Sequence, residues 1–217
     1  MRRLGSIAGT ALFAQLLLGI AAGAAAPGTT ALDRYLDGLK SLRAAFSQSV
    51  TDTRGQKSEQ ASGELLVLRP GRFRWDIHPN RAGESGQLLV ADGRNLWFFD
   101  RDLAQVTVKP MDAALSATPA MLLSGAADVR SAFEVESDGR HEDLDWVRIT
   151  PRSTEADFRE ARLGFAGDDL KRMVLKDKLG QTATLTFERA QRNAHVAVDE
   201  VSFTPPPGTD VIGTPQK

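Results

Sequence analysis

One cation stands at the end of an apolar row in this sequence. Residues 62–77 alternate as a strand, break at Pro70 and Gly71, and then alternate again, which predicts a hairpin. The side chains that share one face of this hairpin are Leu65, Val67, Arg69, Phe73, Trp75 and Ile77. An unpaired guanidinium is very costly to bury, so whatever covers this face should bring oxygen atoms to Arg69. The hairpin therefore predicts a hydrogen-bonded contact between a cation and a covering element.

Other chemistry is sparse in the sequence. The three histidines are His78 in a predicted turn, His141 in a polar loop and His195 near Asn193, and none has the spacing of a metal site. The chain contains no cysteine, which removes disulfides, thiolate metal sites and cysteine nucleophiles. Motifs of serine hydrolases, phosphate-binding loops and zinc peptidases are missing as well. We expect no enzymatic activity, no metal and no cofactor.

The start of the chain has the layout of a secretory signal peptide, which we place at residues 1–25. Two arginines are followed by an apolar run from Ile7 to Ala22 and then by small residues. A membrane anchor is the alternative, but the run is short and includes Gln15. We expect cleavage near Ala25, an exported protein, and one domain over residues 26–217. Without a cysteine, the mature start cannot carry a lipid anchor.

Composition sets further bounds. The chain has 217 residues, of which 41% are hydrophobic and 25% charged, as expected for one globular domain of moderate size. Of the 27 Lys and Arg residues, two lie in the leader, so 25 remain against 28 acidic residues, a net charge of −3. An acidic chain without basic runs does not indicate nucleic-acid binding. No mature stretch approaches the roughly 20 apolar residues of a membrane span, so we expect no stable membrane insertion.

An amphipathic helix of three or four turns is predicted after the leader. Thr29 or Thr30 can cap it, and apolar residues then recur at spacings of three and four. These residues are Leu32, Tyr35, Leu36, Leu39, Leu42 and Phe46. From Phe46 the period changes to two, which predicts the start of a strand.

The rest of the chain is dominated by predicted strands. Asp92-Gly93 is a strong hairpin signal, and Thr118 with Pro119 predicts a short helix. The expected strands after the first hairpin are 87–91, 95–99, 105–109, 133–137, 145–150, 160–165, 170–176, 182–189 and 200–204, followed by an extended tail. Many short strands at regular spacing favour an antiparallel barrel or sandwich over β-α-β units.

The apolar positions could line one concave surface. Beside the hairpin face, we expect Leu88, Val90, Leu96 and Phe98 to contribute from the next strands, with the helix at 32–46 and residues 121–123 as a cover. Parity alone fits a packed core better than a lipid-holding cavity, and both interpretations remain open.

Several segments, taken in order, resemble the periplasmic outer-membrane lipoprotein carrier family. They are L-x-x-Y-L-x-x-L-x-S-L-x-A-x-F-S-Q (Leu32 to Gln48), G-E-L-L-V-L-R-P-G-R-F-R-W (Gly63 to Trp75), L-V-A-D-G-R-N-L-W-F-F-D (Leu89 to Asp100), T-P-A-M-L-L (Thr118 to Leu123), D-x-x-G-Q-T (Asp177 to Thr182) and F-T-P-P-P-G-T-D-V (Phe203 to Val211). The resemblance implies a mainly β fold: an incompletely closed antiparallel β-barrel, or half-barrel, whose apolar cavity is covered by a lid of α-helices.

The resemblance also implies a function and a site. Such a carrier is a periplasmic monomer that takes triacylated lipoproteins from an inner-membrane ABC release complex to an outer-membrane receptor. Matched residue by residue, Arg69 would latch the lid by bonding the main chain at Leu36, Leu123 and Ser124. The family's cavity aromatics match Phe73 and Trp75. Together with the apolar positions of the strands and the cover, the expected lining of the acyl-chain cavity is Leu39, Leu65, Val67, Phe73, Trp75, Ile77, Leu88, Val90, Met121 and Leu122.

Three alternatives remain. One is a periplasmic carrier of glycolipid or another amphiphile. A second is a hydrolase of lipid-like substrates, which needs a polar catalytic group inside the cavity. The third is an interaction domain with a solid core. The outer-membrane receptor itself has a similar fold but is a lipoprotein, which a chain without cysteine cannot be.

Overall fold

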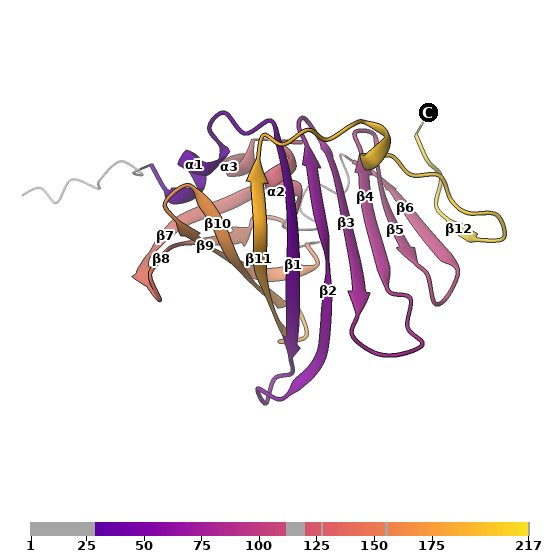
Figure 1. The fold of residues 1–217 in the computed structure, drawn as a ribbon, viewed down its shortest axis with the longest axis horizontal. Coiled ribbons are helices and arrows are strands. Elements are labelled where there is room, and N and C mark those ends of the chain that lie inside the picture. The colour runs from indigo at the N-terminus through magenta and orange to yellow at the C-terminus, as the bar shows by residue number, and fades with distance from the viewer. Residues whose placement is uncertain (1–28, 112–119, 127, 155, 217) are drawn as a thin grey trace, which may run out of the picture.

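A computed structural model of the chain describes residues 29–111, 120–126, 128–154 and 156–216, and one long sheet that bends around short helices dominates it (Figure 1). The helices are α1 (Ala31–Leu36), α2 (Ala120–Ser124), α3 (Val129–Ala132) and the 3-10 helix η2 (Asp199–Val201). The strands are β1 (Ser41–Thr51), β2 (Lys57–Leu68), β3 (Arg72–Pro79), β4 (Gln87–Asp92), β5 (Asn95–Asp100), β6 (Gln105–Pro110), β7 (Phe133–His141), β8 (Leu144–Pro151), β9 (Phe158–Ala166), β10 (Asp169–Asp177), β11 (Thr182–Arg192) and β12 (Asp210–Ile212). The predicted signal peptide lies outside the described residues.

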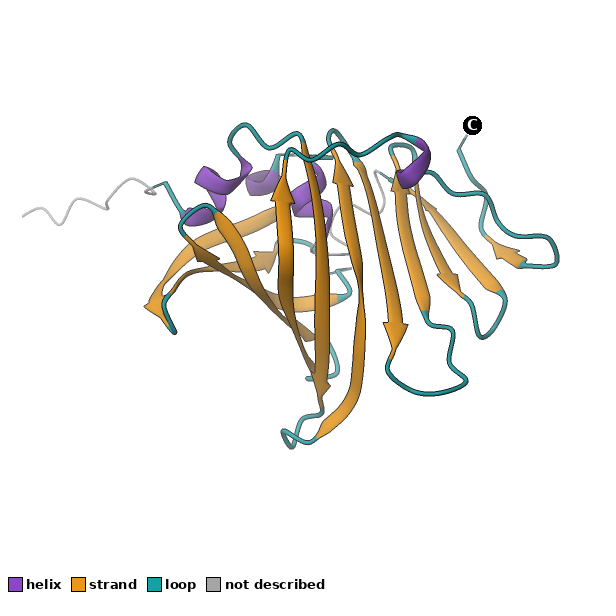
Figure 2. Cartoon of the chain, in the orientation of Figure 1, coloured by secondary structure: helices purple, strands orange, loops and turns teal. Residues whose placement is uncertain are grey.

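The sheet is open. Its strand order is β12-β6-β5-β4-β3-β2-β1-β11-β10-β9-β8-β7, so two antiparallel meanders are joined where β1 pairs with β11. The outermost strands, β7 and β12, lie at opposite ends of this order and do not pair with each other (Figure 2). The mainly β, incompletely closed architecture expected from the resemblance is thereby confirmed. β12 is a parallel addition, pairing with β6.

The first predicted helix is much shorter than expected, and this prediction was wrong beyond Leu36. Thr30 caps α1 in a capping box with Asp33, as the sequence indicated. The helix then ends because Asp37 is extended and Gly38 takes a φ of 65°, a conformation that glycine adopts without strain. The buried residues after it, Leu42, Ala44 and Phe46, alternate along β1.

The expected strand at 200–204 was also wrong. That segment contains η2, and the tail returns to the sheet only at β12. The chain between β11 and β12 crosses the outer face of the sheet, because η2 contacts β2, β3 and β4. In Figure 1 this is the yellow segment that passes over the ends of the first strands.

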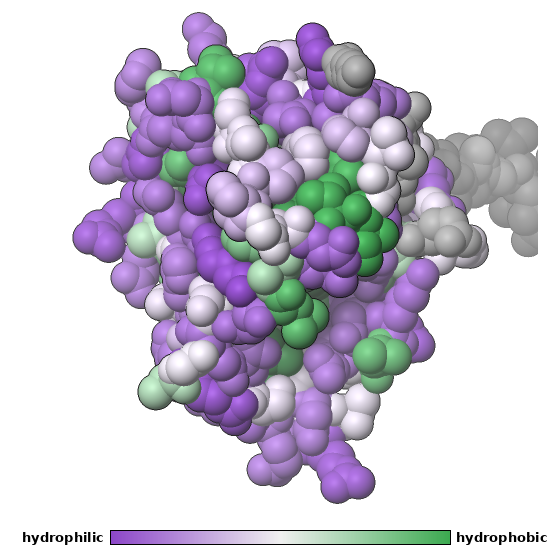
Figure 3. All heavy atoms as spheres, turned by 90° about the vertical axis from the view of Figure 1, so that its right-hand side faces the viewer, coloured by the Kyte–Doolittle hydropathy of each residue, from purple (hydrophilic) through white to green (hydrophobic). Residues whose placement is uncertain are grey.

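The core is divided by the sheet into two sides. The main cluster of buried residues, which we call the inner cluster, takes side chains from α1, α2 and most strands. The opposite face carries two smaller clusters, one of Leu88, Val90, Trp97, Val106 and Val108, and one of Leu66, Val196 and Val201. Viewed from the β12 side, the polar surface is interrupted by apolar patches (Figure 3).

Candidate functional site: the inner face and the helices that cover it

The hairpin of β2 and β3 supplies the central wall of the inner cluster. Leu65 pairs with Trp75 and Val67 with Phe73, and directly paired residues point to the same side of a sheet. All four side chains are buried in the inner cluster. Ile77 packs against its edge, and Leu39, Met121 and Leu122 enter it from the covering segments.

Leu88 and Val90 were assigned to the wrong side. In β4 it is Leu89 that pairs with Trp75 and Ala91 that pairs with Phe73, so these two residues face inward. Leu88 and Val90 point outward into the cluster with Trp97, which is packed under the chain segment that holds Phe203. Sequence alternation gave the period of β4 but not its register against β3, and a shift of one residue reverses every side chain.

Arg69 lies between the sheet and α1. Its Nη1 donates to the carbonyl oxygens of Leu36 and Leu39 at 3.0 and 3.2 Å. Its main-chain N–H donates to the carbonyl of Lys40 at 2.9 Å. Burial lowers the pKa of the Arg69 guanidinium, which nevertheless stays charged because an arginine does not deprotonate in proteins. The Leu36 carbonyl ends α1, where carbonyls carry partial negative charge, and it also accepts the N–H of Leu39, whereas the Leu39 carbonyl belongs to the loop that follows the helix.

The α2 side of this contact differs from the expected one. Among the described residues, the bonds of the Arg69 side chain go to α1 and its following loop, and not to Leu123 or Ser124. Ser124 is buried, and its carbonyl accepts the N–H of Gly71 at 2.8 Å. Gly125 packs directly against the guanidinium, so closely that a Cβ there would lie 2.3 Å from Arg69 Nε.

A second arginine holds α1 from β11, on the other side of β1 from Arg69, and sequence reasoning missed it. Arg192 Nη2 donates to the carbonyls of Tyr35 and Asp37 at 2.9 and 2.8 Å. The next residue, Asn193, donates to the carbonyl of Gly38 and accepts the N–H of Lys40. The α1–β1 connection is therefore tied to the end of β11 as well as to Arg69. Arg192 and Asn193 follow the predicted strand at 182–189, and nothing in the sequence indicated a contact with α1.

One hollow beside α2 is too small for an alkyl chain. The hollow between α2, α3 and the start of β7 has a volume of about 10 Å³ and is lined by Met121, Leu122, Ala126, Asp128, Val129, Ala132 and Phe133. That is room for one water molecule at most. An alkyl chain could therefore enter this hollow only if α2 or α3 moved.

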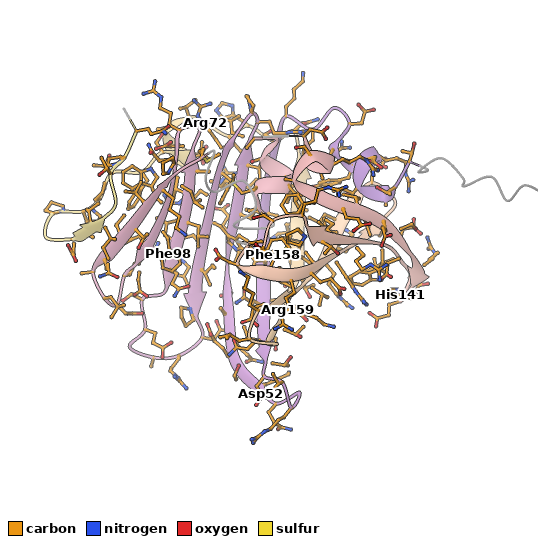
Figure 4. The ribbon with its side chains drawn as sticks, turned by 180° about the vertical axis from the view of Figure 1, so that it is seen from behind. Asp52, Arg72, Phe98, His141, Phe158 and Arg159 are labelled. Atoms are coloured by element: carbon orange, nitrogen blue, oxygen red, sulfur yellow. The ribbon has the colours of Figure 1, made fainter. Side chains whose placement is uncertain are left out.

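The described residues offer little else that could do chemistry. Within the described ranges, no group of three His, Asp or Glu side chains is placed to hold a metal ion. Figure 4 shows the scatter: Asp52 lies at the tip of the β1–β2 hairpin and His141 at the far end of β7. Each helix of the described chain is too short or too polar to span a bilayer.

Comparison with known proteins places this architecture in a family. Residues 37–204 match the family model described as outer membrane lipoprotein carrier protein LolA. An outer-membrane lipoprotein carrier protein of Dechloromonas aromatica is 39% identical over 182 residues, covering 84% of this chain and 86% of that one. The protein of the same name from Chromobacterium violaceum is 38% identical over 199 residues, covering 92% and 94%. A solved LolA superfamily protein from Nitrosomonas europaea covers 81% of this chain and 99% of its own, at 13% identity and a TM-score of 0.47, too low for a comparison of sites. By its family match and by these relatives, this chain belongs to the outer membrane lipoprotein carrier protein family.

Proposed function

We propose that this chain is a periplasmic carrier that shields the acyl chains of lipoproteins against the inner face of its sheet. It would receive triacylated lipoproteins from an inner-membrane ABC release complex, deliver them to an outer-membrane receptor as a monomer, and be exported by the leader at residues 1–25. The names of its relatives are those of a carrier and not of an enzyme. The observation that carries the proposal is a continuous apolar face covered by α1 and α2, with Arg69 bonded to the cover.

In this proposal the helices α1 and α2 act as a lid, and the conformation in which they lie on the sheet is the closed state of the empty carrier. Opening the lid would create an apolar cavity lined by Leu65, Val67, Phe73, Trp75, Ile77, Leu39, Met121 and Leu122. Arg69 would act as the latch, since its bonds to Leu36 and Leu39 exist only while α1 is seated.

The energies fit a carrier that must also release its cargo. Hydrogen bonds from a charged donor contribute about 1.5–3 kcal/mol each. Burying an acyl chain yields roughly 0.8 kcal/mol per CH₂ group, so one long chain outweighs the latch. The latch then favours the closed state of the empty protein without preventing loading, and it assists expulsion of cargo when the receptor offers another apolar site.

Two adjacent phenylalanines of β5 provide a matched test of where cargo binds. Phe98 pairs with Leu89 and faces inward, whereas Phe99 pairs with Leu88 and faces outward, and both are half-buried (Figure 4 labels Phe98). A photo-reactive phenylalanine analogue at position 98 should crosslink to a co-expressed lipoprotein, and the same analogue at position 99 should not. Equal crosslinking from both positions would contradict binding at the inner face.

Mass spectrometry of the protein recovered from membrane-extracted cells identifies the cargo. An intact acylated polypeptide is the expected finding. Free glycolipid would redirect the proposal to another amphiphile, and hydrolysed lipid would indicate an enzyme. Recovery of the bare protein under conditions that keep a known lipoprotein soluble would contradict a carrier role.

A further inference from the structure

Two polar atoms lie inside the otherwise apolar inner cluster. Tyr35 of α1 is 1% exposed and Trp75 of β3 is 5% exposed. In the described part of the chain, neither Tyr35 Oη nor Trp75 Nε1 has a hydrogen-bond partner. Buried polar side chains in native proteins nearly always have a partner, so each exception calls for a reason.

The other two tryptophans behave differently. Trp97 Nε1 donates to Asp92 Oδ2 at 2.7 Å, and Trp146 Nε1 donates to the carbonyl of His141 at 3.0 Å. Trp97 is on the outward face of the sheet. The indole that points into the inner cluster is thus the one whose N–H lacks an acceptor.

The two atoms come from different sides of the cluster. The Tyr35 ring packs against Phe165 of β9, with centroids 5.3 Å apart. The Trp75 ring meets Phe46 of β1 edge-on, with centroids 6.1 Å apart. Tyr35 therefore reaches the inner cluster from α1, and Trp75 reaches it from the sheet.

Both atoms can donate a hydrogen bond, and the tyrosine oxygen can also accept one. An indole N–H can only donate. Burial raises the pKa of the Tyr35 hydroxyl, an effect that the nearby Arg192 charge only partly offsets, so the hydroxyl keeps its proton. What would satisfy them is an acceptor that tolerates an apolar surrounding, which favours a neutral carbonyl over an anion.

We infer that Tyr35 Oη and Trp75 Nε1 donate hydrogen bonds to the carbonyl oxygens of the cargo's acyl linkages. This inference rests on the proposed function. Alkyl chains carry no acceptor, but each chain of an acylated lipoprotein is attached through an ester or amide carbonyl. These carbonyls are the polar atoms that must accompany the chains into the inner face. By bonding the carbonyl of the acyl linkage, the two donors would favour acylated cargo over a plain hydrocarbon or detergent tail.

The test compares two synthetic lipopeptides that differ only in their linkages. One carries two ester-linked chains, the other carries the same two chains through ether linkages without the carbonyls, and both keep the same amino terminus and therefore the same charge. Wild-type protein should bind the carbonyl-containing lipopeptide about 3- to 10-fold more tightly for each carbonyl that a donor engages. Tyr35→Phe removes only the hydroxyl, so it should reduce this preference while leaving the affinity for the ether lipopeptide unchanged.

Trp75→Phe should also reduce the preference for the carbonyl-containing lipopeptide. Because it removes apolar area as well, it should weaken the binding of both lipopeptides. Trp97→Phe is the control, because that indole is already bonded to Asp92 on the outward face and should leave the ratio of the two affinities unchanged. Equal binding of both lipopeptides by the wild-type protein, or an unchanged ratio in both Tyr35→Phe and Trp75→Phe, would overturn the inference and leave the carrier function standing. Binding of neither lipopeptide would overturn the carrier function and this inference with it.

Stability of the empty protein gives an independent readout. If Tyr35 Oη is a donor reserved for cargo, Tyr35→Phe should raise the thermal midpoint of the empty protein, because an unpartnered buried hydroxyl is destabilising. A midpoint lowered by Tyr35→Phe would mean that the hydroxyl serves the fold, and it would overturn the inference for that residue.

Discussion

The guanidinium of Arg192 lies over the ring of Tyr35, with Cζ 5.3 Å from the ring centroid, while its Nη2 bonds the carbonyl of the same residue at 2.9 Å. Both contacts join the end of β11 to α1, a helix too short to be stable alone. α1 is therefore held at its carboxyl end by two cations, Arg69 from one side and Arg192 from the other.

Arg192→Met should loosen α1 without disturbing the sheet. Methionine keeps most of the packing over Tyr35 but loses the bonds to the Tyr35 and Asp37 carbonyls. We expect a loss of about 1–3 kcal/mol in the free energy of unfolding and faster amide exchange confined to α1. Arg54→Met, an exposed cation in the β1–β2 turn, is the control and should leave both unchanged. Exchange that accelerates equally in β1 and β2 would contradict a local role.

The sequence predicted contacts between residues of one segment, but not contacts between residues that are far apart in the chain. The inner face of the β2–β3 hairpin followed from alternation within one segment, and the need of Arg69 for acceptors followed from the cost of burying a charge. The contact of Arg192 with α1 joins positions far apart in the chain, and no spacing rule in a single sequence connects them.

Two errors have a common physical origin. Leu42 and Phe46 are four residues apart, a spacing that fits a helix face and also one side of a strand, so pattern alone could not show that α1 ends at Leu36. Leu88 and Val90 were misplaced because the loop between β3 and β4 sets the register of the pair, and sequence alternation does not reveal it.

The proposed latch predicts a separation of loading from release. Arg69→Leu removes the bonds to the Leu36 and Leu39 carbonyls and thereby weakens the closed state. The variant should fold, bind lipopeptide at least as tightly as the wild type, and transfer it to acceptor protein at least about tenfold more slowly, since about 1.4 kcal/mol already shifts an equilibrium tenfold. Arg72→Leu is the neighbouring control, because Arg72 bonds the Asp92 carbonyl away from α1 (Figure 4). Normal transfer by Arg69→Leu would rule out the latch.

Gly125 offers a way to disturb the same contact without touching the arginine. A Cβ at Gly125 would lie 2.3 Å from Arg69 Nε and 2.5 Å from Nη2, so Gly125→Ala must displace the guanidinium or the end of α2. We expect the empty variant to bind an apolar dye that the wild type excludes, and to lose about 1–3 kcal/mol of stability.

Gly167→Ala separates the clash from the backbone effect. Gly167 has a φ of 59°, close to the 65° of Gly125, but no atom lies within 4 Å of the position that a Cβ would take there. Gly167→Ala should therefore lose the part of the stability that comes from placing alanine at a positive φ, and it should not bind the dye. Dye binding by both variants would show that the effect is not specific to the Arg69 contact.

Asp33 should make the seating of α1 sensitive to acid. Burial alone would raise the pKa of this carboxyl, but hydrogen bonds from Thr30 and Arg130 outweigh it and lower the pKa below 3.8. The Arg130 bond, at 2.8 Å, joins α3 to α1. A carboxyl whose pKa is lower in the folded state stabilises the protein at any pH above its unfolded-state pKa, and this contribution disappears as the pH falls through the folded-state pKa.

Asp33→Asn should therefore cost about 1 kcal/mol of unfolding free energy at about pH 7, and progressively less as the pH falls below 3.8. Denaturant titrations of the wild type and of Asp33→Asn across that pH range measure the difference. Asp157→Asn, at an exposed position just before β9, is the control and should leave the free energy of unfolding unchanged at every pH. A deficit in Asp33→Asn that stays constant into strong acid would mean that the ionised carboxylate is not what holds α1.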